Sequence, residues 1–105
     1  MPFKMSFGNV AHSDSVYSEC ESLAGELRDE FPETTRVEVT LAHERDEYEA
    51  HVHVTGKEID LAGRAKHRDS PSLAAREAFA RAHAQLRKHH DKAIFKHRRD
   101  GHEKS

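Results

Sequence analysis

Apolar and polar residues alternate with a period of two in four stretches of this chain, a pattern typical of strands that have one buried face. The apolar positions are Phe3, Met5 and Phe7; Val37, Val39 and Leu41; Tyr48, Ala50, Val52 and Val54; and Ile59, Leu61, Gly63 and Ala65. The connection at His43–Glu47 and the turn around Gly56 are short enough for hairpins. The last three strands are therefore predicted to form an antiparallel meander.

Two other stretches repeat their apolar residues every three or four positions, which predicts helices that each bury one face. The first runs from Ser13 to Glu30, where Ser13 or Ser15 can cap the N-terminus and Pro32 stops the helix. Its apolar positions are Val16, Cys20, Leu23, Leu27 and Phe31. Because Cys20 falls on this face, we expect it in the core and not as a reactive or metal-bound thiol.

The second helix is predicted to begin with Ser70 as the N-cap and Pro71 as its first residue, and to run to about Lys96. Its buried stripe is predicted to comprise Ala75, Phe79, Ala82, Leu86, Ala93 and Ile94. A helix of this extent is about 40 Å long, so it should overhang the sheet at its C-terminal end. Residues 1–97 are predicted to form a single domain, and residues 98–105 a flexible polar tail.

The resulting order, β-α-β-β-β-α, predicts an α+β fold built as a two-layer sandwich. A four-stranded, mostly antiparallel sheet should carry both helices on one face and leave the other face to water or a ligand. The chain has 105 residues, of which 35% are hydrophobic, so it has room for one small core.

Charge is divided unevenly along the chain. Residues 1–60 contain five Lys/Arg and fourteen Asp/Glu, whereas residues 61–105 contain twelve Lys/Arg and five Asp/Glu. This division indicates one acidic side and one side suited to a polyanion, although the two parts could instead attract each other.

On the last helix, the spacing places Arg81, Lys88, Lys92 and Arg99 opposite the apolar stripe, with Lys96 at the edge of the group. Cations along a rigid rod can meet successive phosphates, although the same stripe could be an ordinary solvated helix face. Basic residues at the end of the last strand extend this surface. The candidate RNA-binding residues are Arg64, Lys66, Arg68, Arg81, Arg87, Lys88, Lys92, Lys96 and Arg99.

The sequence lacks the usual signals of catalysis and of cofactor binding. It has no glycine-rich phosphate loop, no Gly-x-Ser-x-Gly elbow and no Cys-x-x-Cys pair. We therefore expect no enzyme activity, no cofactor and no small-molecule substrate. Among the ten histidines, His51 and His53 point to one side of a strand, where contact with solvent or RNA is favoured over a metal site.

No stretch is apolar enough to span a bilayer, the first ten residues lack the apolar region of a signal peptide, and the single cysteine cannot form an internal disulfide. These features favour a cytoplasmic protein without membrane contact.

Three segments resemble one known family. They are His53–Ile59, Ala75–Phe79 and Gln85–Lys92, with a looser match at Phe7–Asn9. The second half of the chain thereby resembles the hibernation promoting factor and ribosome-associated inhibitor family, also called sigma-54 modulation proteins, and the length resembles its short type. The order of elements expected above is also that of the family.

The resemblance implies a protein that binds the small ribosomal subunit near the tRNA and mRNA sites, contacts ribosomal RNA, and silences translation in stressed or stationary-phase bacterial cells. By position, Arg81, Lys88 and Lys92 match cations on the family's second helix. Two positions depart from the family, since Ala84 stands where relatives often have Arg and His90 where they often have Lys.

Three alternatives remain open from the sequence. One is a protein-interaction module whose acidic first helix docks a basic partner, which predicts binding to a protein and no RNA in pull-downs. Another is a histidine-dependent metal carrier, which predicts stoichiometric zinc or copper by elemental analysis. The third is a generic double-stranded-RNA binder, which predicts binding to duplex RNA without ribosomes.

Overall fold

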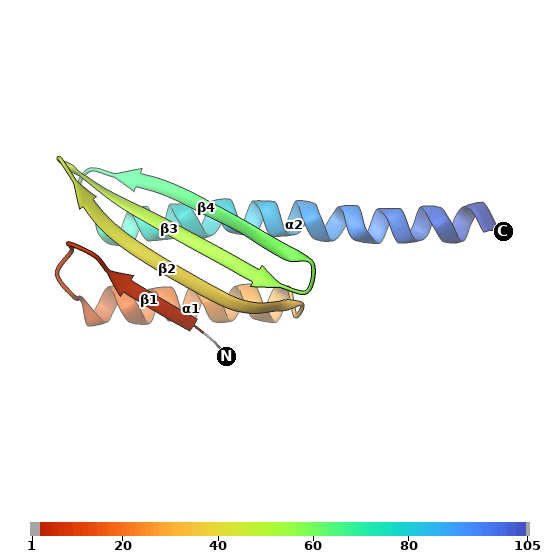
Figure 1. Cartoon of the computed structure of the whole chain (residues 1–105), viewed down its shortest axis with the longest axis horizontal. Helices are drawn as coiled ribbons and strands as arrows, with labels where there is room; N and C mark the ends of the chain where they lie inside the picture. The colour runs from red at the N-terminus through yellow and green to blue at the C-terminus, as the bar shows by residue number, and fades with distance from the viewer. Residues whose placement is uncertain (1–2, 105) are drawn as a thin grey trace.

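Four strands form a single sheet in chain order (Figure 1). They are β1 (Phe3–Phe7), β2 (Thr34–Glu44), β3 (Glu47–Gly56) and β4 (Ile59–His67). The parallel pair is β1 with β2, whereas β2 with β3 and β3 with β4 are antiparallel. This computed structural model describes the backbone of residues 3–104 and the side chains of residues 3–91. The predicted α+β sandwich with a mostly antiparallel sheet is confirmed.

Both helices, α1 (Asp14–Glu30) and α2 (Pro71–Lys104), lie behind the sheet in Figure 1, so one face of the sheet stays uncovered. Each begins at a predicted cap. The Ser13 hydroxyl accepts a hydrogen bond from the Val16 N–H at 3.4 Å, and the Ser70 hydroxyl accepts one from the Leu73 N–H at 3.2 Å. Within the described part of the chain, neither helix is apolar enough over a bilayer's thickness to cross one.

The core lies between the sheet and the two helices. The side chains that alternate inward on β2, β3 and β4, from Val37 to Ala65, are buried or partly buried, as the period of two predicted. From α1 the core receives Val16, Cys20, Ala24 and Leu27, and from α2 it receives Ala74, Ala75, Ala78, Phe79, Ala82 and Leu86. The predicted stripe residues Ala93 and Ile94 lie outside the described side chains.

Helix α2 lies unusually close to β4. A Cβ atom added at Gly63 would sit 2.2 Å from the Ala78 carbonyl oxygen and 2.6 Å from the Ala82 nitrogen. The glycine on the strand and the alanines on the helix therefore let the two backbones approach each other, because neither side places a larger group between them. This contact sets the position of α2 relative to the edge of the sheet.

Two predicted boundaries are wrong. Helix α2 continues to Lys104 instead of ending at about Lys96, because the added residues contain no proline and include two arginines, a glutamate and a lysine that favour the helix. The flexible tail at residues 98–105 stays a prediction. In Figure 1, α2 extends well past the sheet, as its length predicted. The predicted loop at His43–Glu47 is also shorter, because β2 and β3 continue to a tight turn in which Arg45 adopts a φ of 57°.

A bidentate ion pair links α1 to α2. The Arg76 guanidinium donates through Nε and Nη2 to both carboxylate oxygens of Glu19, at 2.8 and 2.9 Å, and the Ser72 hydroxyl donates to the same carboxylate. The hydrogen bond from Arg76 is the largest influence on the pKa of Glu19 and lowers it, although partial burial acts in the opposite direction.

We expect Gly63→Ala to lower the free energy of unfolding by about 1–3 kcal/mol, because the new methyl group forces α2 away from β4. Urea unfolding followed by circular dichroism measures this change. The matched control is Gly25→Ala, a helical position where an added Cβ meets nothing within 4 Å. It should be stabilising by about 0.5–1 kcal/mol. Equal effects of the two substitutions would contradict the proposed close contact.

We expect Glu19→Gln to reduce stability at neutral pH and to flatten its dependence on pH. Since the folded-state pKa of Glu19 is lowered, its stabilising contribution is present above the unfolded-state pKa and is lost as the pH falls through the folded-state value. Unfolding measured from about pH 7 down to about pH 3 tests this. Glu21→Gln, at an exposed position of the same helix, is the control and should leave the dependence of stability on pH unchanged.

Candidate nucleic-acid interface

The free edge of β4 and one flank of α2 form a continuous surface. The Arg81 guanidinium donates a hydrogen bond to the Arg64 carbonyl oxygen, and the Gln85 side-chain amide donates to the Ala62 carbonyl oxygen, both at 2.5 Å. Because β4 is the last strand of the sheet, these carbonyls have no neighbouring strand to bind them. The side chains of α2 thus complete the edge of the sheet and hold Arg81 against it.

This contact corrects the predicted position of Arg81, which does not lie opposite the buried stripe. It lies on the flank of α2 that faces β4, and Lys88, seven residues later, follows on the same flank. We call this surface the cationic edge and define it by five of the predicted residues, Arg64, Lys66, Arg68, Arg81 and Lys88.

The remaining predicted residues are not placed on the cationic edge. Arg87 is exposed but lies one residue, or about 100°, around the helix from Lys88, towards the outer side of α2. The side chains of Lys92, Lys96 and Arg99 lie outside the described residues, although the backbone of α2 passes through all three positions.

Two of the cations already have a carboxylate partner. Lys66 lies 3.7 Å from Glu49, and Arg81 lies 2.9 Å from Glu77, one helical turn away. Both pairs are exposed to solvent, where such pairs contribute little and a phosphate can compete for the cation. Among the side chains of residues 3–91, no carboxylate lies within 4.0 Å of the charged groups of Arg64, Arg68, Arg87 or Lys88.

The opposite flank of α2 has a different electrostatic environment. It faces α1 and the residues that directly follow α1. Arg76 binds the Glu19 carboxylate there, His83 lies 3.0 Å from Glu30, and His90 lies 3.3 Å from Glu33. The ion pair of Arg76 with Glu19 agrees, on this flank, with the alternative in which the two parts of the chain attract each other. The cationic edge is the flank that stays available to an external anion.

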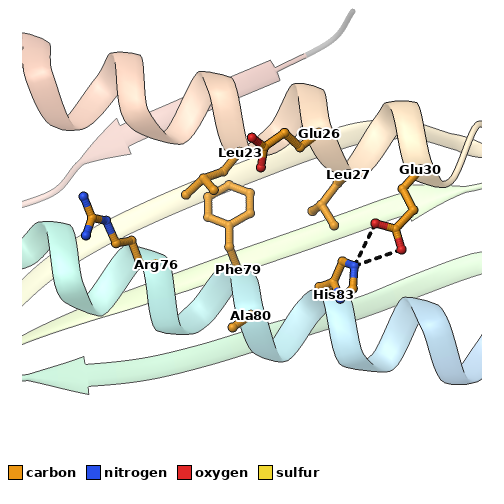
Figure 2. Close-up of a pocket in the computed structure, with 8 residues that line it drawn as sticks. All are labelled: Leu23, Glu26, Leu27, Glu30, Arg76, Phe79, Ala80 and His83. Atoms are coloured by element: carbon orange, nitrogen blue, oxygen red, sulfur yellow. Dashed lines mark hydrogen bonds and ion pairs between the residues drawn. The ribbon is translucent and has the colours of Figure 1, made fainter.

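A hollow of about 330 Å³ lies between the two helices (Figure 2). Leu23 and Leu27 of α1 and Phe79 of α2 form its apolar floor, while the Glu30 carboxylate and the His83 ring meet at one end. The hollow lies beside the acidic helix α1, which is the surface that would dock a basic partner if the protein were an interaction module.

The remaining reactive side chains do not form a metal site in the described part of the chain. Burial raises the pKa of the Cys20 thiol to about 12, which keeps it protonated. No group of three or more potential metal ligands comes together among the described residues. Sequence reasoning missed Gln85 as an edge-binding residue, although its position one turn after Arg81 places both on the same flank.

The fold resembles solved structures of two bacterial proteins. A ribosomal subunit interface protein from Coxiella burnetii superposes with a TM-score of 0.79 at 13% identity, covering 87% of this chain and 99% of the other. The N-terminal domain of Protein Y from Thermus thermophilus superposes with a TM-score of 0.73 at 18% identity, covering 84% and 98%. These identities are low, so the two superpositions establish the fold alone.

No curated protein sequence matches the chain. The match to a family is by contrast extensive, since the model of the family described as "Sigma 54 modulation protein / S30EA ribosomal protein" covers residues 3–94. The chain therefore belongs to the sigma 54 modulation protein / S30EA ribosomal protein family.

Proposed function

We propose that this protein binds ribosomal RNA of the small ribosomal subunit near the tRNA and mRNA sites and silences ribosomes during stress or in stationary phase. The observation that carries the proposal is the cationic edge, on which Arg64, Arg68 and Lys88 are exposed without a carboxylate partner among the described side chains. Family membership and the description of one structural neighbour as a ribosomal subunit interface protein support the ribosome as the partner.

The cationic edge suits a folded RNA because its cations are fixed in space. Arg81 is held by the Arg64 carbonyl oxygen, and Arg64 projects from a hydrogen-bonded strand. Each cation that meets a phosphate releases condensed counterions, so affinity should depend strongly on salt and little on sequence. Helix α2, with 34 residues, is about 51 Å long and can follow several phosphates.

Inhibition follows from occupancy and not from catalysis. A two-layer domain that binds near the tRNA and mRNA sites occupies space that these RNAs need. The acidic exposed face of α1, with Glu21, Glu26 and Asp29, would be repelled by phosphates and therefore faces away from the RNA or towards basic ribosomal proteins. The site of action is then the cytoplasm, where ribosomes translate.

We expect Lys88→Glu to weaken co-sedimentation with small ribosomal subunits by about tenfold at low salt, because one charge-assisted phosphate contact is lost and replaced by repulsion. The slope of log affinity against log salt should fall by about one unit. The measurement is sedimentation of purified protein with purified subunits over a series of salt concentrations. Arg28→Glu, the same charge change at an exposed position of α1, is the control and should bind as the unmodified protein does.

Unchanged affinity and an unchanged salt slope for Lys88→Glu would reject the cationic edge as the RNA-binding surface. Binding to a ribosomal protein that survives removal of RNA, and that is lost in Glu26→Lys instead, would favour the interaction module. Binding to duplex RNA as tight as binding to ribosomes would favour a generic double-stranded-RNA binder.

A further inference from the structure

The uncovered face of the sheet carries a pair of parallel aromatic rings. His51 and His53 are two residues apart on β3, so both project from the same side of the strand, away from the helices. Their ring centroids lie 6.2 Å apart and their planes differ by 9°. Both side chains are only partly buried, so one side of the pair is open to solvent.

The two rings are held in place by their neighbours. The ring of His53 shares a hydrogen bond of 2.6 Å with the carboxylate of Asp60 on β4. Burial is the main cause of a lowered pKa at His51, and the positive charge of Arg64 contributes in the same direction. At neutral pH His51 is therefore an uncharged aromatic ring.

Each ring has one short and one charged neighbour along the strand register. Ser6, Thr40, His51 and Arg64 form one row across the four strands. In the next row, Ala62 lies beside His53 on β4 and Glu38 lies beside it on β2. The short side chains of Thr40 and Ala62 therefore leave room for a planar group on one side of each ring, whereas Arg64 and Glu38 stand on the other side.

The charges around this surface favour an anion beside Arg64. Towards the β2–β3 turn, Glu44, Glu47 and Glu49 would repel a phosphate. Beside the histidines, Glu38 is paired with Arg36 at 2.8 Å and Asp60 with His53. Further cations on this face are Lys4 and Lys66, the latter paired with Glu49. Arg64, directly opposite His51, is the cation beside the rings that has no carboxylate partner among the described side chains.

We propose that this uncovered face binds single-stranded RNA, with bases stacked on the rings of His51 and His53 and an adjacent phosphate held by Arg64. Every base has an aromatic face, so such stacking tolerates any sequence, and a strand free of pairing is needed to expose that face. The row from Ser6 to Arg64 crosses three inter-strand spacings, or about 14 Å, which is the length of about four stacked bases. The inference rests on the proposed function, because it specifies the form of RNA that this protein contacts.

The probe is a short single-stranded oligoribonucleotide that contains 2-aminopurine, whose emission falls when the base stacks, titrated with the full chain. We expect the emission to fall on binding and the affinity to exceed that for a duplex of the same sequence. His51→Ala and His53→Ala should each weaken binding by about tenfold. His51→Phe and His53→Phe should retain binding, since they keep a ring and remove the imidazole nitrogens. Thr40→Ala, in the same row but without a ring, is the control and should bind as the unmodified protein does.

Three results would overturn the inference: no binding of the oligonucleotide, equal affinity of the alanine variants and the unmodified protein, or phenylalanine variants as weak as the alanine variants. The last result would mean that the histidines act by hydrogen bonding or charge and not by stacking. Thermal unfolding of each variant shows whether a loss of binding is caused by a loss of folding. If an alanine variant does not fold, the phenylalanine variant at the same position tests the inference instead. Co-sedimentation of the unmodified protein with ribosomal subunits separates the two proposals: if subunits are bound and the oligonucleotide is not, this inference fails alone, whereas loss of subunit binding contradicts the proposed function.

Discussion

The close packing of α2 against β4 is the contact on which the rest of the structure depends. Gly63 has no side chain to separate the two backbones, and Ala78 and Ala82 present only methyl groups. At this separation Arg81 and Gln85 reach carbonyl oxygens on the edge of the sheet. A larger residue at Gly63 would move the cations of α2 away from those of β4, so the proposed binding surface depends on how the core is packed.

The same packing gives the two flanks of α2 opposite electrostatic environments. The flank beside α1 meets Glu19, Glu30 and Glu33, so its cation and its histidines have partners within the molecule. The flank beside β4 meets a strand whose outward residues include Arg64 and Lys66. Net charge, formally −2, therefore says little about the partner, because a polyanion responds to the local field at the surface it approaches.

Periodicity was sufficient to predict the elements, the buried faces and both helix caps, because each is set by residues close together in the sequence. The position of Arg81 was not predictable in this way. A helical projection gives the angle between side chains, but which flank borders the sheet depends on the tertiary contact at Gly63. The end of α2 was missed for a related reason, since a polar composition is compatible with both a tail and an exposed helix. The alternation on β3 placed His51 and His53 on one side, whereas the parallel orientation of their rings depends on neighbours such as Asp60 on another strand.

Arg64 connects the two surfaces that we propose bind RNA. Its side chain follows His51 in the row across the uncovered face, and its carbonyl oxygen holds Arg81 at the edge. An RNA strand that crosses the sheet along this row therefore arrives at the cationic edge without passing the carboxylates near the β2–β3 turn. The two surfaces would respond differently to salt. Contacts with phosphates weaken at high salt, because the release of counterions from the RNA is then less favourable, whereas stacking on uncharged rings does not release counterions. A protein that uses both should keep part of its affinity at salt concentrations that abolish binding by the cationic edge alone.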